Sequence, residues 1–480
     1  MKNTFRLLTS HLSTHILKLF GYISFLVLNL TGCAFGPDYK RPDVKLPQEW
    51  AHQSKDPTQK INLKWWENFQ DSCLTDLIKE AIQENLDLKA AEARILQARA
   101  NLRGIVANLF PQINMDGTIS RNRRSENSVN GGGGEGSPYY SEYKAQFDVS
   151  WEIDFFGRVK RGKEAALAQL ESSIFDRHAI SIILYADIAQ NYISLRKNQH
   201  IKKVLKDLIQ DWQKLYDLNL DLKKSGLSND IQLLNIKSSL DEAKAAISPI
   251  KANINAFIYQ LSFLLGKNPT DLKEKLSKAS PMPSWNAALI LDLPSTLIQR
   301  RPDIRKAEED LKDATALIGV HLADLFPRFS LTGIFGHDAN IPSQFFKASS
   351  RYFTLGANPS FVLFDFGRIR AVIDEAKGFK DEKFYMYKNT ILNAFKEVEE
   401  FCIHYLMDAE QEGKLQLVYK DAAKSLENSK TRFVQGLDPY INVLNSQINL
   451  RSKELNLLDV TEKKLLDVIA LSKALGGGWS

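Results

Sequence analysis

The chain changes its hydrophobic period twice. From Cys73 to Asn108, apolar and small residues recur at helical spacing, and after Pro111 they alternate with polar residues as in a β-strand. Proline accounts for the change, because it cannot donate a backbone hydrogen bond and it disfavours the α region in the residue before it. The motif Ala-Asn-Leu-Phe-Pro returns as Ala-Asp-Leu-Phe-Pro, 216 positions later. The predicted helix-to-strand junctions are Leu109, Phe110 and Pro111, and Leu325, Phe326 and Pro327.

Four segments alternate strictly enough to predict β-strands with one apolar face. In the second of them, Phe147, Val149 and Trp151 share that face. The glycine run 131–134 lacks the lysine and hydroxyl ending of a phosphate-binding loop, so we interpret it as a flexible connection. The predicted strands are 112–122, 143–155, 328–337 and 352–364.

Long helical patterns flank the strands. Residues 158–224 contain no proline, which predicts one helix about 100 Å long. Gly226 then provides a C-terminal cap and Asn229 an N-terminal cap for a return helix over 230–265. That helix and the single helix predicted over 73–108 are each about 54 Å long, so the two in line would match the long helix.

The second half of the chain repeats this plan. Beyond the first pair of strands, the matching motifs are 210 positions apart. We predict an internal duplication, with repeat 1 at 73–266, an equatorial linker rich in proline at 267–292, and repeat 2 at 293–480. The matching motifs are Phe156-Gly157-Arg158 with Phe366-Gly367-Arg368, and Gly226-Leu227 with Gly436-Leu437.

The N-terminus carries a targeting signal. Residues 1–32 contain the basic start, apolar run and short end of a secretory signal peptide. The tetrad Leu-Thr-Gly-Cys, which ends at Cys33, is similar to the bacterial lipobox. That similarity implies cleavage before Cys33 and its modification with diacylglycerol and an N-acyl chain. Ala34 at the next position implies sorting to the outer membrane. The alternative is a buried cysteine after an ordinary signal.

The segment 33–72 is expected to be an N-terminal anchor and equatorial segment. It contains Pro37, Pro42, Pro47 and Pro57 before the aromatic motif at residues 65–69. So many prolines are unfavourable for a core element. We therefore expect the segment to be irregular and to lie along another part of the chain.

Composition and charge limit the kinds of binding partner and active site that the chain could have. The net charge of +6 becomes +3 without the three cations of the leader, which argues against a nucleic-acid partner. The three cysteines form no disulfide framework, and the histidines are scattered. With neither a nucleophile motif nor a metal motif, we expect no enzymatic activity and no cofactor apart from the lipid on Cys33.

Each alternating segment has about the length that a tilted strand needs to cross a bilayer. Two amphipathic hairpins packed on a soluble core would give the same pattern. Four strands cannot close a membrane barrel, because an open edge leaves backbone groups unpaired in lipid. If these strands enter the membrane, the chain must therefore oligomerise.

The order of these motifs resembles the TolC-type outer-membrane efflux protein family, particularly its lipoprotein branch serving tripartite resistance-nodulation-division (RND) pumps. The resemblance implies a mixed membrane protein: a homotrimer with a 12-stranded transmembrane β-barrel and a 12-helix periplasmic tunnel, an α-helical barrel. The motifs that carry it are Cys33, Gly36-Pro37-Asp38-Tyr39, Arg41-Pro42, Trp65-Trp66, Phe69 and Asp71, together with both Leu-Phe-Pro junctions, both Phe-Gly-Arg motifs and both glycine turns.

The function implied is that of a passive exit duct for drugs or other toxic small molecules. Its partners would be a periplasmic adaptor (membrane fusion) protein, an inner-membrane RND-type transporter and outer-membrane lipid. An outlet of type I protein secretion would use the same architecture. A lipid-anchored periplasmic stalk without a lumen is a structural alternative, and it would have to bury the apolar face of the strands.

The resemblance also assigns roles at the opposite ends of the helices. The glycine turns would be the tips that contact the adaptor, although simple helix capping also explains them; their residues are Gly226, Leu227, Ser228, Gly436, Leu437 and Asp438. The periplasmic aperture would be lined by Gln232, Asn235, Asn442 and Asn445. Several family members have acidic residues at the last two positions. We hypothesise a gate that closes through hydrogen bonds and packing and binds cations weakly; solvated helix positions are the alternative.

Overall fold

The computed structural model describes residues 34–44, 50–51, 64–125, 138–285 and 294–479. The chain divides into two compact units. The first, here the sheet unit, comprises Met1–Pro42, Ile95–Ser172 and Glu308–Met386. The second, here the helical unit, comprises Asp43–Arg94, Ser173–Ala307 and Tyr387–Ser480. Each unit takes segments from both halves of the chain, so the compact units do not coincide with the halves of the sequence.

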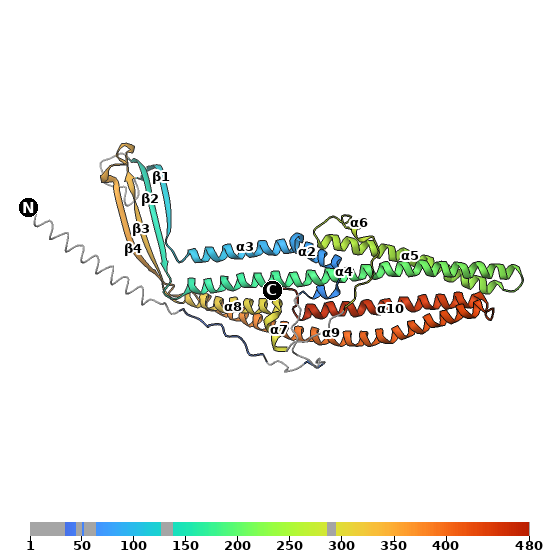
Figure 1. The fold of residues 1–480 in the computed structure, drawn as a ribbon. Helices are drawn as coiled ribbons and strands as arrows, with labels where there is room; N and C mark the ends of the chain where they lie inside the picture. The colour runs from blue at the N-terminus through green and yellow to red at the C-terminus, as the bar shows by residue number, and fades with distance from the viewer. Residues whose placement is uncertain (1–33, 45–49, 52–63, 126–137, 286–293, 480) are drawn as a thin grey trace, which may run out of the picture. The chain divides into compact units, whose positions relative to one another are not determined.

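Each half of the chain contains two helices, two strands, a long helix and a return helix in the same order (Figure 1). The first half contains η1 (Trp65–Phe69), α2 (Ser72–Glu84), α3 (Leu86–Ala107), β1 (Gln112–Arg123), β2 (Tyr139–Ile153), α4 (Arg158–Lys224) and α5 (Asp230–Leu264). The second contains α6 (Lys273–Leu276), α7 (Pro294–Arg300), α8 (Pro302–Ala323), β3 (Arg328–Ala339), η2 (Pro342–Gln344), η3 (Ala348–Ser350), β4 (Arg351–Ser360), α9 (Arg368–Val434) and α10 (Tyr440–Ala474). The long helices α4 and α9 have 67 residues each, and the return helices α5 and α10 have 35 each.

The sheet unit contains one four-stranded antiparallel sheet in the order β1-β2-β3-β4. Its register places Met115, Phe147, Phe335 and Phe353 in one row across all four strands. Because side chains alternate along a strand, every second row lies on the same face. The register therefore decides which residues share a face.

The strand bounds differ from the sequence prediction by a few residues. β2 begins at Tyr139, where it pairs with Arg123, and ends at Ile153 instead of residue 155. It ends early because the next residue, Asp154, accepts hydrogen bonds from the first turn of α4. β4 ends at Ser360 instead of residue 364, since its partner strand begins opposite that residue.

The single helix predicted over 73–108 is wrong: the helix is broken at Asn85. The Asn85 Oδ1 atom accepts the backbone N–H of Leu88 at 2.9 Å, which caps α3. Its Nδ2 atom donates to the carbonyl oxygen of Leu264 at 2.8 Å. The second bond comes from α5, far along the chain, so helical periodicity could not reveal the break.

The aromatic motif of the N-terminal segment belongs to the core, contrary to the prediction. Trp65, Trp66 and Phe69 of η1 are all buried in the main cluster of the helical unit. Trp66 packs edge-on against Tyr185 of α4, with ring centroids 5.1 Å apart. The prolines precede this motif and therefore do not prevent it from packing. Burial of its large aromatic rings is favourable because it removes a large apolar surface from water.

The first part of the linker packs against the helical unit. Its described part, residues 267–285, includes α6, and Leu272 and Leu276 there are buried. Nearer the turns at Gly226 and Gly436, a smaller core is formed by Leu215 of α4, Ile236 of α5 and Leu444 of α10. In the chain as described, no helix combines the length and the apolar character that crossing a membrane requires.

Candidate functional site

The sheet has one apolar and one polar face, and the apolar face is exposed. Met115 at 70%, Phe353 at 73% and Leu355 at 79% retain most of their accessible surface. The rows of this face are Trp151, Leu331 and Ala357; Ile113, Val149, Gly333 and Leu355; and Met115, Phe147, Phe335 and Phe353. The opposite face carries mainly polar residues, among them Asn114, Asp116, Gln146, Asp148, Thr332 and Thr354.

The sheet also has two free edges. β1 pairs with β2 alone and β4 with β3 alone in the described sheet. Each outer strand therefore presents a row of backbone N–H and C=O groups on its open side, and such a row readily pairs with another strand. A large exposed apolar face with open edges is a surface for assembly.

The first predicted junction is built as a tight turn. α3 ends at Ala107, and the backbone N–H of Phe110 donates to its carbonyl oxygen at 3.0 Å. The carbonyl oxygen of Leu109 accepts the Trp151 indole N–H at 3.0 Å, while Pro111 precedes the first residue of β1. The Phe110 ring remains 65% exposed.

The second junction has the same backbone plan but different packing. α8 ends at Ala323, and Pro327 precedes β3. The Phe326 ring stacks on those of Phe35 and Phe156, at centroid distances of 4.2 and 4.8 Å, and those two rings lie 5.8 Å apart, so the three form one cluster. Leu325 stays 39% exposed. The motifs are nearly identical in sequence, so their different environments come from the segment that contributes Phe35.

That segment, residues 34–42, is here called the N-terminal strap. Arg161 of α4 binds it: the guanidinium donates to the carbonyl oxygens of Phe35 and Gly36, both at 3.2 Å, and to the Asp38 carboxylate at 2.7 Å. The Arg161 side chain is only 6% exposed. Its hydrogen bond lowers the pKa of Asp38 below the ordinary value.

Two glycines allow the strap to lie directly on α8. Gly36 has φ +104°, and a Cβ there would lie 2.5 Å from the Cα of Gly319. A Cβ on Gly319 would lie 2.7 Å from the carbonyl oxygen of Phe35. Farther along, the Arg41 guanidinium makes two hydrogen bonds with Glu308, at 2.9 and 2.5 Å.

Sequence reasoning missed these contacts. In the sequence, the motif from Gly36 to Arg41 indicates only a resemblance to a family. Its contact with Arg161, more than 100 residues away, cannot be predicted from the neighbouring residues. Cys33, the predicted lipidation site, lies outside the described residues and immediately precedes the strap.

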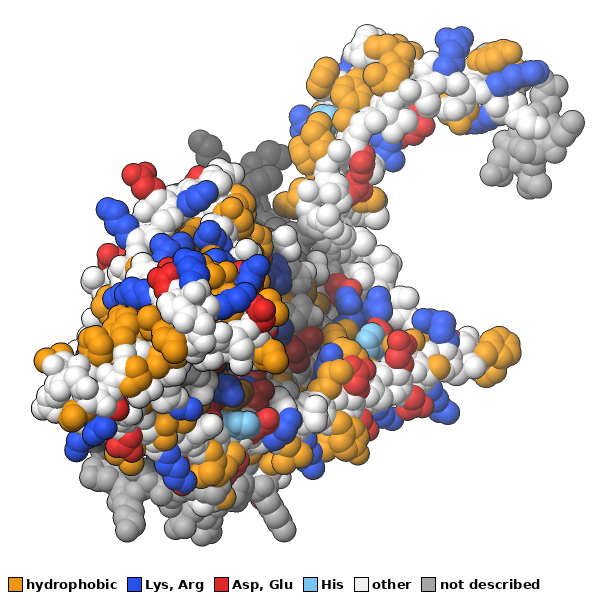
Figure 2. All heavy atoms as spheres, turned by 90° about the vertical axis from the view of Figure 1, so that its right-hand side faces the viewer, with side chains coloured by type: hydrophobic (Ala, Val, Ile, Leu, Met, Phe, Trp, Pro, Cys, Tyr) orange, Lys and Arg blue, Asp and Glu red, His pale blue; other side chains and the backbone are white. Residues whose placement is uncertain are grey.

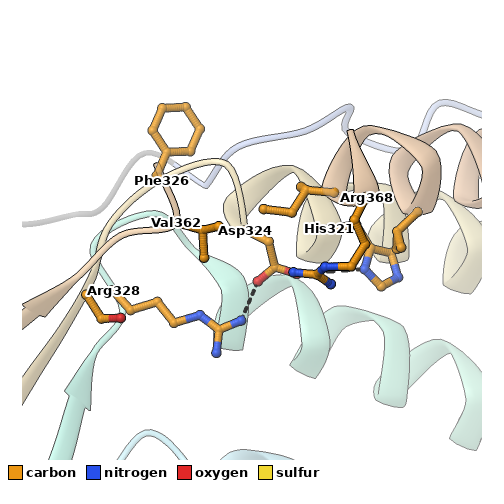
Figure 3. Close-up of a pocket in the computed structure, with 9 residues that line it drawn as sticks. His321, Asp324, Phe326, Arg328, Val362 and Arg368 are labelled. Atoms are coloured by element: carbon orange, nitrogen blue, oxygen red, sulfur yellow. Dashed lines mark hydrogen bonds and ion pairs between the residues drawn. The ribbon is translucent and has the colours of Figure 1, made fainter. Parts of the chain in front are cut away.

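Two hollows lie where the outer strands meet the helices. One, of about 560 Å³, is lined by residues of the first junction and by Trp151, Glu152 and Arg158. The other, of about 310 Å³, lies at the second junction beside the end of β4 (Figure 3). Figure 3 shows Arg328 reaching Asp324, 2.6 Å away, while the Phe326 ring points away from this pair. Each hollow borders an outer strand.

The glycine turns have the same capping geometry. Gly226 and Gly436 have φ +75° and +71°. In each turn the residue after the glycine donates back to the helix, Leu227 to Leu222 at 2.8 Å and Leu437 to Arg432 at 2.9 Å, as in a Schellman motif.

The remaining turn residues make local contacts. Ser228 donates to Gln232 at 3.4 Å, and Asp438 accepts from Arg432 Nε at 2.5 Å. Leu227 and Leu437 are 76% and 61% exposed. The contact role of the turns stays a prediction.

The four predicted aperture residues are exposed on the surfaces of α5 and α10. The buried faces of these helices lie elsewhere, at Leu233 and Ile236 and at Val443 and Leu444. The structure does not bring Gln232 and Asn235 together with Asn442 and Asn445 through a hydrogen bond between described residues. Their gating role therefore stays a prediction. Across the described ranges, no three His, Cys, Asp or Glu residues form a group suited to a metal ion.

Comparison with known proteins gives a consistent result. The family model described as outer membrane efflux protein matches residues 77–267 and 293–477. The chain is 29% identical over 459 residues to the probable efflux pump outer membrane protein TtgC of Pseudomonas putida, covering 94% of this chain and 93% of that protein. It is 28% identical over 463 residues to the cation efflux system protein CusC of Escherichia coli, covering 95% and 97%.

Among solved structures, the outer-membrane channel OprN superposes with a TM-score of 0.85 at 27% identity, covering 93% of this chain and 100% of that one. The predominantly helical fold with a small sheet is thus that of outer-membrane channels. The chain belongs to the outer membrane efflux protein family.

Proposed function

We propose that the chain is one subunit of a passive exit duct in the outer membrane, the last component of a tripartite efflux system. The observation that carries this proposal is the exposed apolar face of the sheet, in register across all four strands and bounded by two open edges. A lipid environment favours such a face, whereas water does not.

Closure of the sheet requires further copies. In lipid, each unpaired backbone group at an open edge costs several kcal/mol, so β1 and β4 must find partners. Pairing β4 of one copy with β1 of the next removes both edges without any new element. Three copies give a 12-stranded barrel, whose polar face, with Asn114, Asp148 and Thr354, lines the lumen.

The helices would form the periplasmic part of the duct. The long helices α4 and α9 have 67 residues each, and the return helices α5 and α10 have 35 each. Each duplicated half would supply two columns of the tunnel. One column is the long helix, and the other is the return helix in line with the helices that precede the strands. Three copies therefore form a tunnel of 12 columns. The turns at Gly226 and Gly436 would contact a periplasmic adaptor, and Asn442 and Asn445 would line the closed end.

The proposed partners are a second and third copy of the chain, an adaptor protein, an RND-type inner-membrane transporter and outer-membrane lipid. Cys33 would carry the covalent diacylglycerol and N-acyl chain. The names of relatives refer to toluene efflux in Pseudomonas putida and to cation efflux in Escherichia coli. We therefore propose drugs or other toxic small molecules as the exported class.

The experiment is a matched pair of substitutions on the two faces of the sheet. Phe335→Asp places a charge in the middle of the apolar row, and Thr354→Asp places the same charge on the polar face. On the lipid face, a basic side chain costs about 2–4 kcal/mol near the bilayer midplane, and a carboxylate is unfavourable by a smaller amount. We expect Phe335→Asp to lower the yield of membrane-inserted trimer strongly, and Thr354→Asp to leave it near wild type.

Native mass of the detergent-purified, full-length protein gives the readout. A mass of three chains for wild type and Thr354→Asp, with loss of that species in Phe335→Asp, supports the proposal. A monomer in all three proteins, or equal yields of trimer from both variants, contradicts it and favours a stalk whose apolar face is buried by protein.

A further inference from the structure

The apolar face of the sheet is not uniform along its length. Beyond the row of Met115 and Phe353, towards the hairpin ends of the strands, lies the row of Gly117, Ala145, His337 and Arg351. Farther in the same direction, Arg121 and Arg123 of β1 lie on this face opposite Ser141 and Tyr139. Arg121 and Arg123 of β1 and Arg351 of β4 are here called the arginine patch; β1 and β4 are the two outer strands of the sheet, with β2 and β3 between them.

The junction end of the same face has no such charge. Its rows contain Trp151, Leu331, Phe329 and Pro359. In the four strands, whose residues are all described, no residue on this face is acidic. On the opposite face, by contrast, Lys144 lies beside Asp338. The arginines of this face therefore all lie towards its hairpin end.

The surroundings of the patch are those of a membrane interface. Arg121, Arg123 and Arg351 are exposed, and the Arg123 guanidinium lies 5.6 Å from the centroid of the Tyr139 ring. In the β3–β4 connection, Phe346 is 83% exposed beside exposed Lys347. Figure 2 shows blue Lys and Arg side chains among orange hydrophobic ones towards the free end of the sheet. Aromatic rings that bound an apolar band are typical of a lipid-water boundary.

Guanidinium groups at this place favour phosphate. Arginine donates in a planar fork that matches two phosphate oxygens, and it is less strongly hydrated than lysine. An anionic lipid headgroup attracts each basic residue near it. Exposed apolar side chains adjoin the patch. Ile119 lies between the rows of Arg351 and Arg121, and Met115 and Phe353 lie in the row on the junction side of Arg351. All three are more than two-thirds exposed, so acyl chains would find apolar contacts there.

We propose that the arginine patch binds the phosphate groups of a phosphorylated glycolipid in the outer leaflet, with its acyl chains along the apolar rows of the same face. This inference rests on the membrane location of the sheet proposed above. It adds an orientation, with the hairpin ends outward and the junctions inward, and a specific lipid partner for the assembled duct.

The test measures lipid retention by purified full-length trimer. The probe is bisphosphorylated lipid A, compared with the same lipid after enzymatic removal of its phosphates. The variant Arg121→Gln/Arg123→Gln/Arg351→Gln removes the patch. The control Lys377→Gln/Lys396→Gln/Lys414→Gln removes three exposed cations from α9, all with surface ion partners.

We expect wild type and the control to retain the phosphorylated lipid and the patch variant to bind it about tenfold or more weakly. Equal binding by the patch variant and wild type would overturn the inference, as would equal binding of the phosphorylated and dephosphorylated lipids to wild type. The second comparison needs no variant, so it decides the matter even if the patch variant does not assemble. Trimer mass, recorded in the same samples, reports on the proposed function separately.

Discussion

The four connections between helices and strands form two pairs. The inner junctions, β2–α4 and α8–β3, adjoin the inner strands, and the outer junctions, α3–β1 and β4–α9, adjoin the outer strands; the two pairs differ in what covers them. At the inner junctions, the N-terminal strap lies so close that a Cβ on Gly157 would meet Ala34 at 2.6 Å and one on Gly319 would meet Phe35 at 2.7 Å. At the outer junctions, a Cβ on Gly104 or Gly367 would meet no described atom within 4 Å. Among the residues that the structure describes, the N-terminal strap therefore covers the inner junctions and not the outer ones.

This difference separates the contacts made within one chain from the surfaces that a neighbouring copy would contact. Within one chain, the strap contacts α4, α8 and the junction residues Phe156 and Phe326. The outer junctions adjoin the strands whose edges are free, and the exposed Phe110 ring lies at one of them. Each of the two hollows extends from an inner junction to an outer strand. A neighbouring copy that pairs with those edges would cover the outer junctions, as the strap covers the inner ones.

The largest effect is expected from removing the residue that holds the strap. Arg161→Met leaves two strap carbonyls and the Asp38 carboxylate without their donor. Hydrogen bonds from a charged group contribute up to about 3 kcal/mol. We expect docking of the strap to weaken by about 3 kcal/mol, seen as hydrogen exchange of the Phe35 amide about a hundredfold faster. Arg370→Met, at an exposed position on α9, should leave that exchange within about threefold of wild type.

The two junction phenylalanines should respond to alanine in different assays. Phe326→Ala removes a ring that stacks on two others, and we expect about 2 kcal/mol of lost strap docking. Phe110→Ala should leave strap docking unchanged, because the ring is 65% exposed and among the described residues no ring contact joins it to Phe35. If a neighbouring copy covers it, the same change should reduce the fraction of trimer at low protein concentration. A trimer fraction unaffected by Phe110→Ala would contradict coverage by a neighbour.

The same small substitution should have opposite signs at two helical glycines. Gly319→Ala forces a methyl group against the strap, and overpacking of this kind costs about 1–3 kcal/mol. Gly104→Ala meets open space in α3 and should stabilise its helix by about 0.5–1 kcal/mol. Thermal unfolding of the purified variants measures both. A stabilising Gly319→Ala would show that the strap is not seated on α8.

These contrasts also define what the sequence could reveal. The Leu-Phe-Pro motifs predicted both junctions, and alternation predicted the faces of Phe147 and Phe335, because both features are local. The packing of Phe326 and the exposure of Phe110 were not predictable, since both motifs read Leu-Phe-Pro and their environments differ through the distant Phe35 and Phe156. The helix break at Asn85 and the burial of Trp65 likewise depend on tertiary contacts that no local period records.

The smallest effect concerns acid. Because Arg161 lowers the pKa of Asp38, folding favours the ionised carboxylate. This ion pair contributes fully above the ordinary pKa of 3.8, and its contribution is lost as the pH falls through the lowered value. In carboxyl-labelled protein, the carbon chemical shift of Asp38 should report a mostly ionised group at pH 3.8. In Arg161→Met the group should be about half protonated there. Identical titrations would contradict the pairing.

Conductance of the purified, full-length protein in a planar lipid bilayer tests whether this chain assembles into a duct. We predict discrete current steps of uniform size in wild type, and their loss in Phe335→Asp, whose charge faces lipid. Insertion without current steps, or steps that persist unchanged in Phe335→Asp, would contradict a pore built from these strands.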